Sequence, residues 1–215
     1  GKSTLLYILG GFIPLQSGSI QVNNHPIAGP GPDRGVVFQH FALFPWKTVL
    51  DNILYGLKKK NLSKKESVDI AQYYIELVQL SGFENAYPEQ LSGGMKQRVA
   101  IARTLAIDPE FLLMDEPFGA LDAQTRRLMQ EELLAVWRGS PKTVMFVTHD
   151  VREAVFLSDR VAVMSSRPGG IKEIVDTKFD DADFDEMVAN PAFLEKTEYL
   201  WHLVKDEATK AVGDD

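Results

Sequence analysis

The octapeptide LSGGMKQR at residues 91–98 indicates the fold more strongly than any other stretch of this chain. At its position just before the two glycines, Ser92 can cap a helix by accepting a hydrogen bond from a backbone N–H of the first turn. Gly93 and Gly94 carry no side chains over that turn, so its N–H groups are open to an anion. An ordinary Ser/Gly loop before a helix accounts for the cap but not for the whole octapeptide.

The segments around the octapeptide alternate between helical and extended patterns. Continuous apolar runs at 111–114 and 143–147 predict buried parallel strands. Strands that alternate with helices indicate an α/β core with right-handed crossovers. Further strands are expected at 19–22, 36–38 and 160–164, and helices at 2–9, 48–57, 63–80, 93–107, 123–137 and 151–157. Asn23-Asn24 predicts a turn after the strand at 19–22, and the spacing of Ser63 and Glu66 predicts a capping box at the start of the helix at 63–80.

We therefore expect one domain in three parts. The α/β core would comprise 1–47 and 108–175, a helical lobe at 48–107 would be inserted into it, and 176–215 would form an acidic, mostly helical extension. Twelve acidic and four basic residues give the extension a net charge of −8, so the rest of the chain carries +1 of the total −7. A near-neutral body argues against a nucleic-acid partner.

Composition excludes some chemistry. The chain has no cysteine, which rules out disulfides and thiolate catalysis. No apolar run approaches the length of about 18 residues typical of a membrane-spanning helix, so none is expected.

The first four residues, Gly1-Lys2-Ser3-Thr4, match the end of the phosphate-binding pattern GxxxxGK[ST]. Glycine lets the backbone approach phosphate closely, and the N–H groups of a following helix favour the anion. In such a loop Lys2 reaches the β- and γ-phosphates and the Ser3 hydroxyl binds Mg²⁺. Taken alone, these four residues would be interpreted as an ordinary surface turn.

The segment FLLMDEP at 111–117 places two carboxylates at the end of an apolar strand. Ligands of open α/β sheets bind at that end of the strands. Asp115 is placed to hold Mg²⁺ through its water shell, and Glu116 to orient or deprotonate an attacking water. The alternative is a strand followed by an acidic helix cap.

Taken in order, these motifs closely resemble those of ABC ATPases. The resemblance covers residues 1 to about 175 and rests on GKST (1–4), Gln39, LSGGMKQR (91–98), FLLMDEP (111–117), Ala120-Leu121-Asp122 and His149. It implies a P-loop NTPase core with a parallel sheet and an inserted α-helical lobe. Three stretches look like the nitrate/sulfonate/taurine group of bacterial importer ATPases, and Tyr199-Leu200-Trp201 does so more weakly. The three are GPGPDRGVVFQ (29–39), LFPWKTVLDNILYGL (43–57) and MDEPFGALDAQTR (114–126).

The resemblance implies an ATPase that uses ATP and Mg²⁺. Glu116 would be the catalytic base, Gln39 would contact the metal or the water, and His149 would reach the γ-phosphate. Nucleotide-binding residues would be Gly1, Lys2, Ser3, Thr4 and Asp115, with Ser3, Gln39 and Asp115 around the metal. A lone histidine after a strand is usually structural, but His149 follows both carboxylates in the family's order. His25, His40 and His202 lack such a context and are assigned no role.

The same resemblance implies a head-to-tail pair of subunits with two ATP molecules between them. Ser92, Gly93 and Gly94 would close over the ATP of the other subunit, and Asp122 would lie between the subunits. Transmembrane permease subunits would be direct partners, and a periplasmic or lipoprotein solute-binding protein an indirect one. The protein would then be peripheral, on the cytoplasmic face of the bacterial inner membrane, and would power import of nitrate-, sulfonate- or taurine-like solutes.

Two surface features leave alternatives open. Phe41, Phe44 and Trp46 would either pack the helical lobe against the core or receive a helix of a membrane subunit. The lysines at 58–60 and 64–65 form a solvated face or a contact with the membrane surface.

The first five positions of the phosphate loop, the strand before it and the aromatic residue on which the family stacks adenine are absent from the sequence. We therefore expect missing N-terminal strands, a weak ATPase, and a gap or exposed edge beside the strand at 111–115. A non-catalytic fragment is thus one alternative function. A soluble, non-transport ABC ATPase acting on DNA or ribosomes is another, although the sequence has no long coiled-coil insertion and no second cassette.

Overall fold

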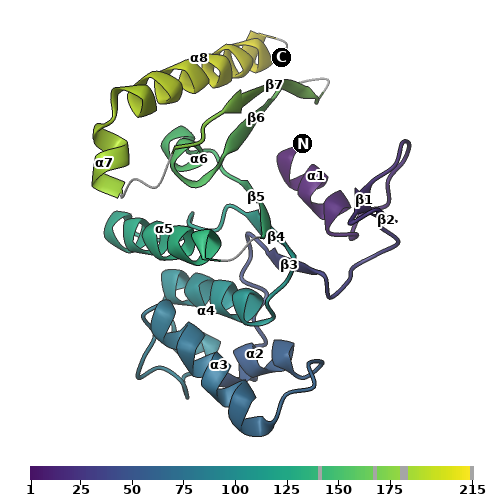
Figure 1. The fold of residues 1–215 in the computed structure, drawn as a ribbon, viewed down its shortest axis with the longest axis vertical. Coiled ribbons are helices and arrows are strands. Elements are labelled where there is room, and N and C mark those ends of the chain that lie inside the picture. The colour runs from purple at the N-terminus through teal and green to yellow at the C-terminus, as the bar shows by residue number, and fades with distance from the viewer. Residues whose placement is uncertain (140–141, 167–168, 180–183, 214–215) are drawn as a thin grey trace. The chain divides into compact units, whose positions relative to one another are not determined.

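The computed structural model describes residues 1–139, 142–166, 169–179 and 184–213 (Figure 1). The chain forms two compact units. The larger comprises Ser3–Val147, and the smaller combines Gly1–Lys2 with Thr148–Asp215.

A three-stranded parallel sheet forms the centre of the larger unit. Its strands are β3 (Arg34–Val37), β4 (Phe111–Asp115) and β5 (Thr143–Val147), paired in the order β3-β4-β5. The central strand is buried from Leu112 to Asp115, as a strand covered on both faces requires. Asp115 pairs in register with Val147, so the predicted carboxylates stand at the carboxyl edge of the sheet.

The sheet corrects the expectation of a gap beside residues 111–115. β4 has a partner on each side, and in the described part of this unit β3 and β5 each pair on one side only, with β4. Only Val147 of β5 is buried, so the continuous burial predicted for 143–147 was also wrong. An apolar run does not reveal which strand of a sheet lies at its edge.

α1 (Lys2–Leu9) packs on one face of this sheet. Leu6 is fully buried and forms a core cluster with Leu113 and Val147. Beyond α1, β1 (Gln21–Val22) and β2 (His25–Pro26) form a short hairpin. The turn predicted at Asn23-Asn24 is confirmed, with φ of 50° and 62° at these residues, the positive values that tight hairpin turns require.

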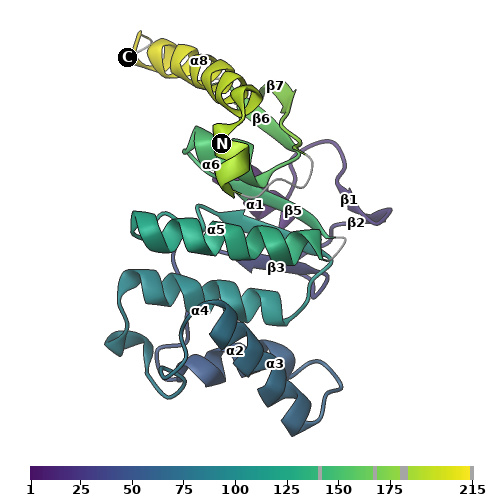
Figure 2. The same cartoon turned by 60° about the vertical axis from the view of Figure 1, so that its left-hand side comes forward.

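Helices cover the larger unit beyond the sheet. α2 (Val49–Leu57), α3 (Lys64–Leu77) and α4 (Gly93–Ala106) pack together, with a short 3-10 turn, η1 (Pro88–Gln90), before α4. The predicted capping box of α3 is confirmed, because Ser63 and Glu66 exchange bonds of 3.2 and 2.7 Å. α5 (Ala123–Arg138) runs alongside α4, on the side of β4 opposite to α1 (Figures 1 and 2).

The smaller unit contains α6 (Val151–Leu157), β6 (Arg160–Met164), β7 (Ile171–Asp176), α7 (Phe184–Ala189) and α8 (Pro191–Gly213). β6 was expected to be parallel to the other strands, but it pairs antiparallel with β7, which the sequence did not predict. The connection over residues 165–170 is too short for a parallel crossover, which needs a dozen residues or more.

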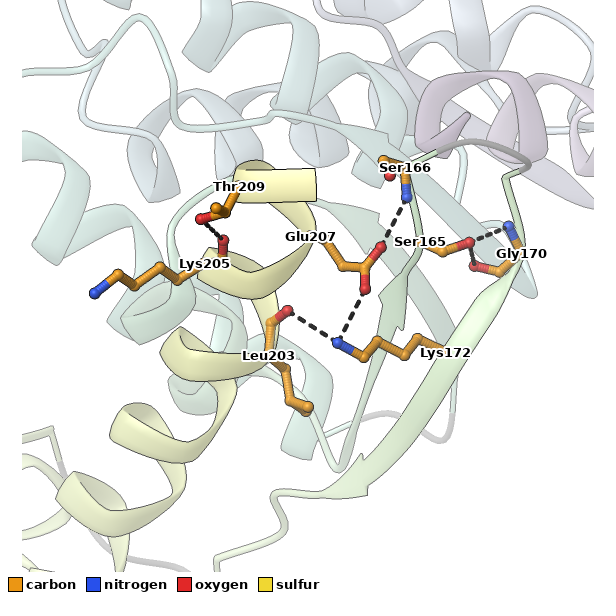
Figure 3. Close-up of polar contacts among 8 residues, drawn as sticks. All are labelled: Ser165, Ser166, Gly170, Lys172, Leu203, Lys205, Glu207 and Thr209. Carbon is orange, nitrogen blue, oxygen red and sulfur yellow. Dashed lines mark hydrogen bonds and ion pairs between the residues drawn. The ribbon is translucent and has the colours of Figure 1, made fainter. Parts of the chain in front are cut away.

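α8 is bound to this hairpin by a partly exposed ion pair (Figure 3). The Glu207 carboxylate accepts a hydrogen bond from the Ser166 backbone N–H at 3.1 Å and pairs with Lys172 at 3.0 Å. The predicted helical C-terminal region is observed as α7 and α8. Asp183, just before α7, lies outside the described residues. No helix within the described ranges has the length and apolar character needed to cross a membrane.

Candidate active site

Asp115 is the best-enclosed polar group of the predicted site. Its side chain is 1% exposed, and both carboxylate oxygens accept hydrogen bonds. Ser3 Oγ donates to Oδ1 and the Tyr7 hydroxyl donates to Oδ2, each at 3.0 Å. A buried carboxylate is tolerated when its oxygens are bonded in this way. Burial and the hydrogen bond to Asp115 raise the pKa of Tyr7, which keeps its phenol protonated as a donor.

Glu116 adopts a backbone conformation that is uncommon for its residue type. Its φ is +48°, in the left-handed region. Two backbone bonds hold it there, one from the Glu116 N–H to the Val147 oxygen at 2.9 Å and one from the Gly119 N–H to the Glu116 oxygen at 3.2 Å. Such strain persists only where neighbouring structure enforces it, and it concentrates at functional sites.

Gln39 and Glu116, far apart in the sequence, meet at the edge of the sheet. Gln39 Nε2 donates to Glu116 Oε2 at 3.3 Å. Gln39 is exposed and Glu116 is half-buried, so solvent reaches this pair. The structure therefore places a partly exposed carboxylate directly after an enclosed one.

The predicted cap of α4 is present. Ser92 Oγ accepts a hydrogen bond from the Met95 N–H at 3.2 Å, and Ser92 and Gly93 are exposed. A Cβ at Gly94 would lie 3.2 Å from Leu121 Cδ2 and 3.4 Å from the Ala120 oxygen. Glycine at this position therefore permits close contact between α4 and the segment before α5.

Asp122 caps α5. Its carboxylate accepts a hydrogen bond from the Thr125 N–H at 3.0 Å, and this bond is the main cause of a lowered Asp122 pKa. The residue is exposed. Its local role is thus structural, and its carboxylate is also accessible to a second molecule.

In the smaller unit, Lys2 and His149 line one cavity of ≈ 370 Å³ together with Gly1, Thr148 and Asp150. Asp150 caps α6 by accepting bonds from the Arg152 and Glu153 N–H groups at 2.9 and 3.2 Å. Two predicted phosphate-contacting residues therefore share one cavity. Thr4, the remaining member of the first motif, is exposed on α1 in the larger unit.

The aromatic residues after Gln39 divide between packing and exposure. The half-buried Phe44 ring lies 4.4 Å from that of Tyr55 and 5.8 Å from that of Trp46. Trp46 is 71% exposed and Tyr55 47% exposed. Phe44 therefore takes part in packing, whereas Trp46 is accessible, and docking of a membrane subunit stays a prediction.

Two polar side chains that sequence reasoning missed hold this aromatic segment. Asn52 is fully buried and binds the backbone of Phe44 through both amide atoms, at 2.9 and 3.2 Å. Arg103 of α4 donates to the Ala42 and Phe41 oxygens at 2.7 and 3.3 Å. A buried asparagine four residues after a helix cap is a weak signal by itself.

Tyr7 was also missed, although its spacing of four residues from Ser3 puts both on one helical face.

The oxygen groups at Ser3 and Asp115 suit Mg²⁺, which binds through one or two carboxylates and substrate phosphates and keeps several waters. No group of three or more histidines, cysteines and acids able to enclose a metal occurs in the part of the chain that the structure describes. A metal at Ser3 and Asp115 would therefore depend on the phosphates of a nucleotide for further ligands.

Fold and site together define a P-loop-type nucleoside triphosphatase cassette. The family model described as ABC transporter matches residues 1–119. An uncharacterized ABC transporter ATP-binding protein, MJ0412 of Methanocaldococcus jannaschii, is 52% identical over 99% of this chain and 78% of its own length. The chain therefore belongs to the ABC transporter family, as one of its ATPase cassettes.

Other relatives confirm the predicted resemblance to the nitrate and taurine group. The nitrate import ATP-binding protein NrtD of Synechocystis sp. is 55% identical over 80% of this chain and 65% of its own length. The taurine import ATP-binding protein TauB of Rhizobium johnstonii is 47% identical over 93% of this chain and 78% of its own.

Solved structures confirm the predicted fold class. A dimeric post-hydrolysis state of the ATP-binding cassette MJ0796, bound to ADP and phosphate, superposes with a TM-score of 0.73 at 32% identity. The match covers 83% of this chain and 82% of that one.

Proposed function

We propose that this cassette hydrolyses ATP to power an importer of small oxyanions or organosulfur compounds such as nitrate or taurine. The observation that supports ATP hydrolysis is that the two adjacent carboxylates at the end of β4 differ in exposure and in hydrogen-bond partner. Asp115 is enclosed and bonded to Ser3, whereas Glu116 is partly exposed and bonded to Gln39. The solute class is supported by the names of the nitrate and taurine import relatives.

Each side chain has a separate task in this proposal. Ser3, Asp115 and Gln39 would hold Mg²⁺, which when bound neutralises charge on the ATP phosphates. Gly1, Lys2 and Thr4 contact the phosphates, and His149 contacts the γ-phosphate.

Glu116 accepts a proton from the water that attacks the γ-phosphorus. The bond from Gln39 Nε2 engages one carboxylate oxygen of Glu116 and orients the group. A change in the position of Gln39 would therefore alter the base, which gives this residue a way to report nucleotide state.

A second copy of the cassette, or a similar ATPase subunit, completes the site. Ser92, Gly93 and Gly94 would approach the ATP of the opposite subunit, with Asp122 between the subunits. The exposure of Ser92, Gly93 and Asp122 in a single chain supports this assignment, as does the dimeric state of the similar cassette.

The permease would dock where Trp46 and Tyr55 are exposed. Lys47 and Lys58 lie 5.8 and 5.9 Å from the Tyr55 ring centroid, so the aromatic face has a basic border. A solute-binding protein would deliver the solute to the permease from the other side of the membrane. This arrangement makes the cassette a peripheral protein on the cytoplasmic face.

Uptake by the assembled transporter in proteoliposomes tests the proposed function. Nitrate and taurine, each with the matching solute-binding protein, should be compared with and without internal ATP, and a Glu116→Gln transporter serves as the inactive control. ATP-dependent uptake of either solute supports the proposal. ATP hydrolysis without uptake of either would refute the solute class, and ATP-dependent export would refute the direction.

A further inference from the structure

One helix holds both oxygens of the Asp115 carboxylate. Ser3 and Tyr7 lie four residues apart on the same face of α1 and donate to Oδ1 and Oδ2 respectively, both at 3.0 Å. Leu6, fully buried between them in the chain, anchors this helix against Leu113 of β4. The placement of both hydroxyls is therefore fixed by the packing of α1 on the sheet.

The two hydroxyls are not equivalent. Ser3 belongs to the phosphate-binding motif, and its oxygen would leave Asp115 for Mg²⁺ when nucleotide binds. Tyr7 lies one turn beyond that motif, and its ring contacts Phe38 with centroids 6.0 Å apart. Its bond to Oδ2 can therefore persist after the bond from Ser3 is released.

We propose that Tyr7 is a positioning residue for the metal: it fixes Oδ2 of Asp115 so that Oδ1 stays directed at the metal's water shell once Ser3 has turned to Mg²⁺. This inference rests on the proposed placement of Mg²⁺ at Ser3 and Asp115. The terminal torsion of an aspartate is broad, so two anchored oxygens define its orientation better than one. Without the phenol, a buried oxygen would also lose its partner.

Tyr7→Phe tests this role, because it keeps the ring and removes only the hydroxyl. Mn²⁺ should be titrated into the subunit saturated with ADP, with the electron paramagnetic resonance signal of free Mn²⁺ as the readout. Partners that orient metal ligands typically contribute 10- to 100-fold to metal affinity, so the Kd for Mn²⁺ should rise by roughly that factor. In hydrolysis assays the KM for Mg²⁺ should rise similarly, with a much smaller change in kcat at saturating Mg²⁺.

Tyr199→Phe is the matched control. The Tyr199 hydroxyl also donates to a carboxylate, Glu173 Oε1, at 2.8 Å, but on α8 of the smaller unit. Its removal should leave Mn²⁺ affinity unchanged. Binding of ADP without metal, measured on each sample, reports the folded fraction and separates loss of metal affinity from loss of fold.

The outcomes distinguish the role of Tyr7 from the proposed placement of Mg²⁺ at Ser3 and Asp115, on which that role rests. Wild-type Mn²⁺ affinity in Tyr7→Phe, together with a loss in Asp115→Asn, would overturn the role of Tyr7 while the metal placement stands. Unchanged affinity in both Asp115→Asn and Ser3→Ala would overturn the metal placement, and the role of Tyr7 with it.

Discussion

The carboxyl end of β4 and the aromatic segment at residues 41–48 are both held firmly, but with opposite results for their side chains. At β4 the functional group itself is fixed, since Asp115 is 1% exposed and bonded at both oxygens. In the aromatic segment the backbone is fixed by Asn52 and Arg103, while Trp46 remains 71% exposed. A site for chemistry needs enclosed, oriented groups, whereas a docking surface needs a rigid backbone with accessible side chains.

Removing the proposed base should give the largest effect. Glu116→Gln keeps the shape of the side chain but cannot accept the proton, so turnover should fall by about 10²–10⁴-fold while ATP binding persists. Steady-state hydrolysis by the purified subunit is the measurement, and Glu76→Gln on an exposed face of α3 is the control. Equal turnover in the variant and the parent would remove Glu116 from its role.

A bulky side chain at the start of α4 should act through the partner subunit. Ser92→Arg places bulk where the opposite subunit's ATP is proposed to lie, and displacing reacting groups by about 1 Å can cost on the order of 10²-fold in rate. Hydrolysis should fall accordingly, while nucleotide binding to the monomer is spared. Sedimentation with ATP should find no closed dimer, and normal closure would contradict the assignment in trans.

The anchor of the aromatic segment should affect stability. Asn52→Ala leaves the partly buried Phe44 N–H without its partner, which costs about 1–3 kcal/mol in the free energy of unfolding. Urea unfolding measures this loss, and uptake should fall more than basal hydrolysis because the segment proposed to dock the permease loosens. A stability equal to that of the parent would show that Asn52 does not anchor the segment.

The exposed tryptophan should have the smallest effect on the isolated subunit. Trp46→Ala should change the free energy of unfolding by no more than about 0.5 kcal/mol, as usual for a surface position. In the assembled transporter it should reduce uptake while basal hydrolysis continues. Phe44→Ala is the informative partner variant, because its half-buried ring should reduce stability as well. Matching losses of stability in both variants would assign Trp46 to packing rather than docking.

Features set by neighbouring residues were predicted well. The cap at Ser92, the capping box at Ser63 and the strand at 111–115 depend on contacts within a few residues or on a continuous apolar run, and the structure contains all of them. The family's motif order also assigned Gln39 and Glu116 to one site, and the structure shows a hydrogen bond between them.

Features set by tertiary packing were not predicted. The antiparallel pairing of β6 depends on β7, whose sequence IKEIVD mixes charged and apolar residues without the strict alternation that predicts a strand. The roles of Tyr7, Asn52 and Arg103 depend on which backbone or carboxylate the fold brings to each side chain. Residue type and spacing alone do not contain that information.

Trapping of ATP as a function of Mg²⁺ concentration most directly tests the proposed roles of Asp115 as metal ligand and Glu116 as catalytic base. Glu116→Gln and Asp115→Asn each change a single carboxylate to an amide, at adjacent positions of one edge. Gel filtration with radiolabelled ATP should find a Mg²⁺-dependent, ATP-bound dimer for Glu116→Gln and none at the same Mg²⁺ concentration for Asp115→Asn. Identical trapping by the two variants, or a Glu116→Gln dimer that forms equally well without Mg²⁺, would contradict the separate roles of base and metal ligand.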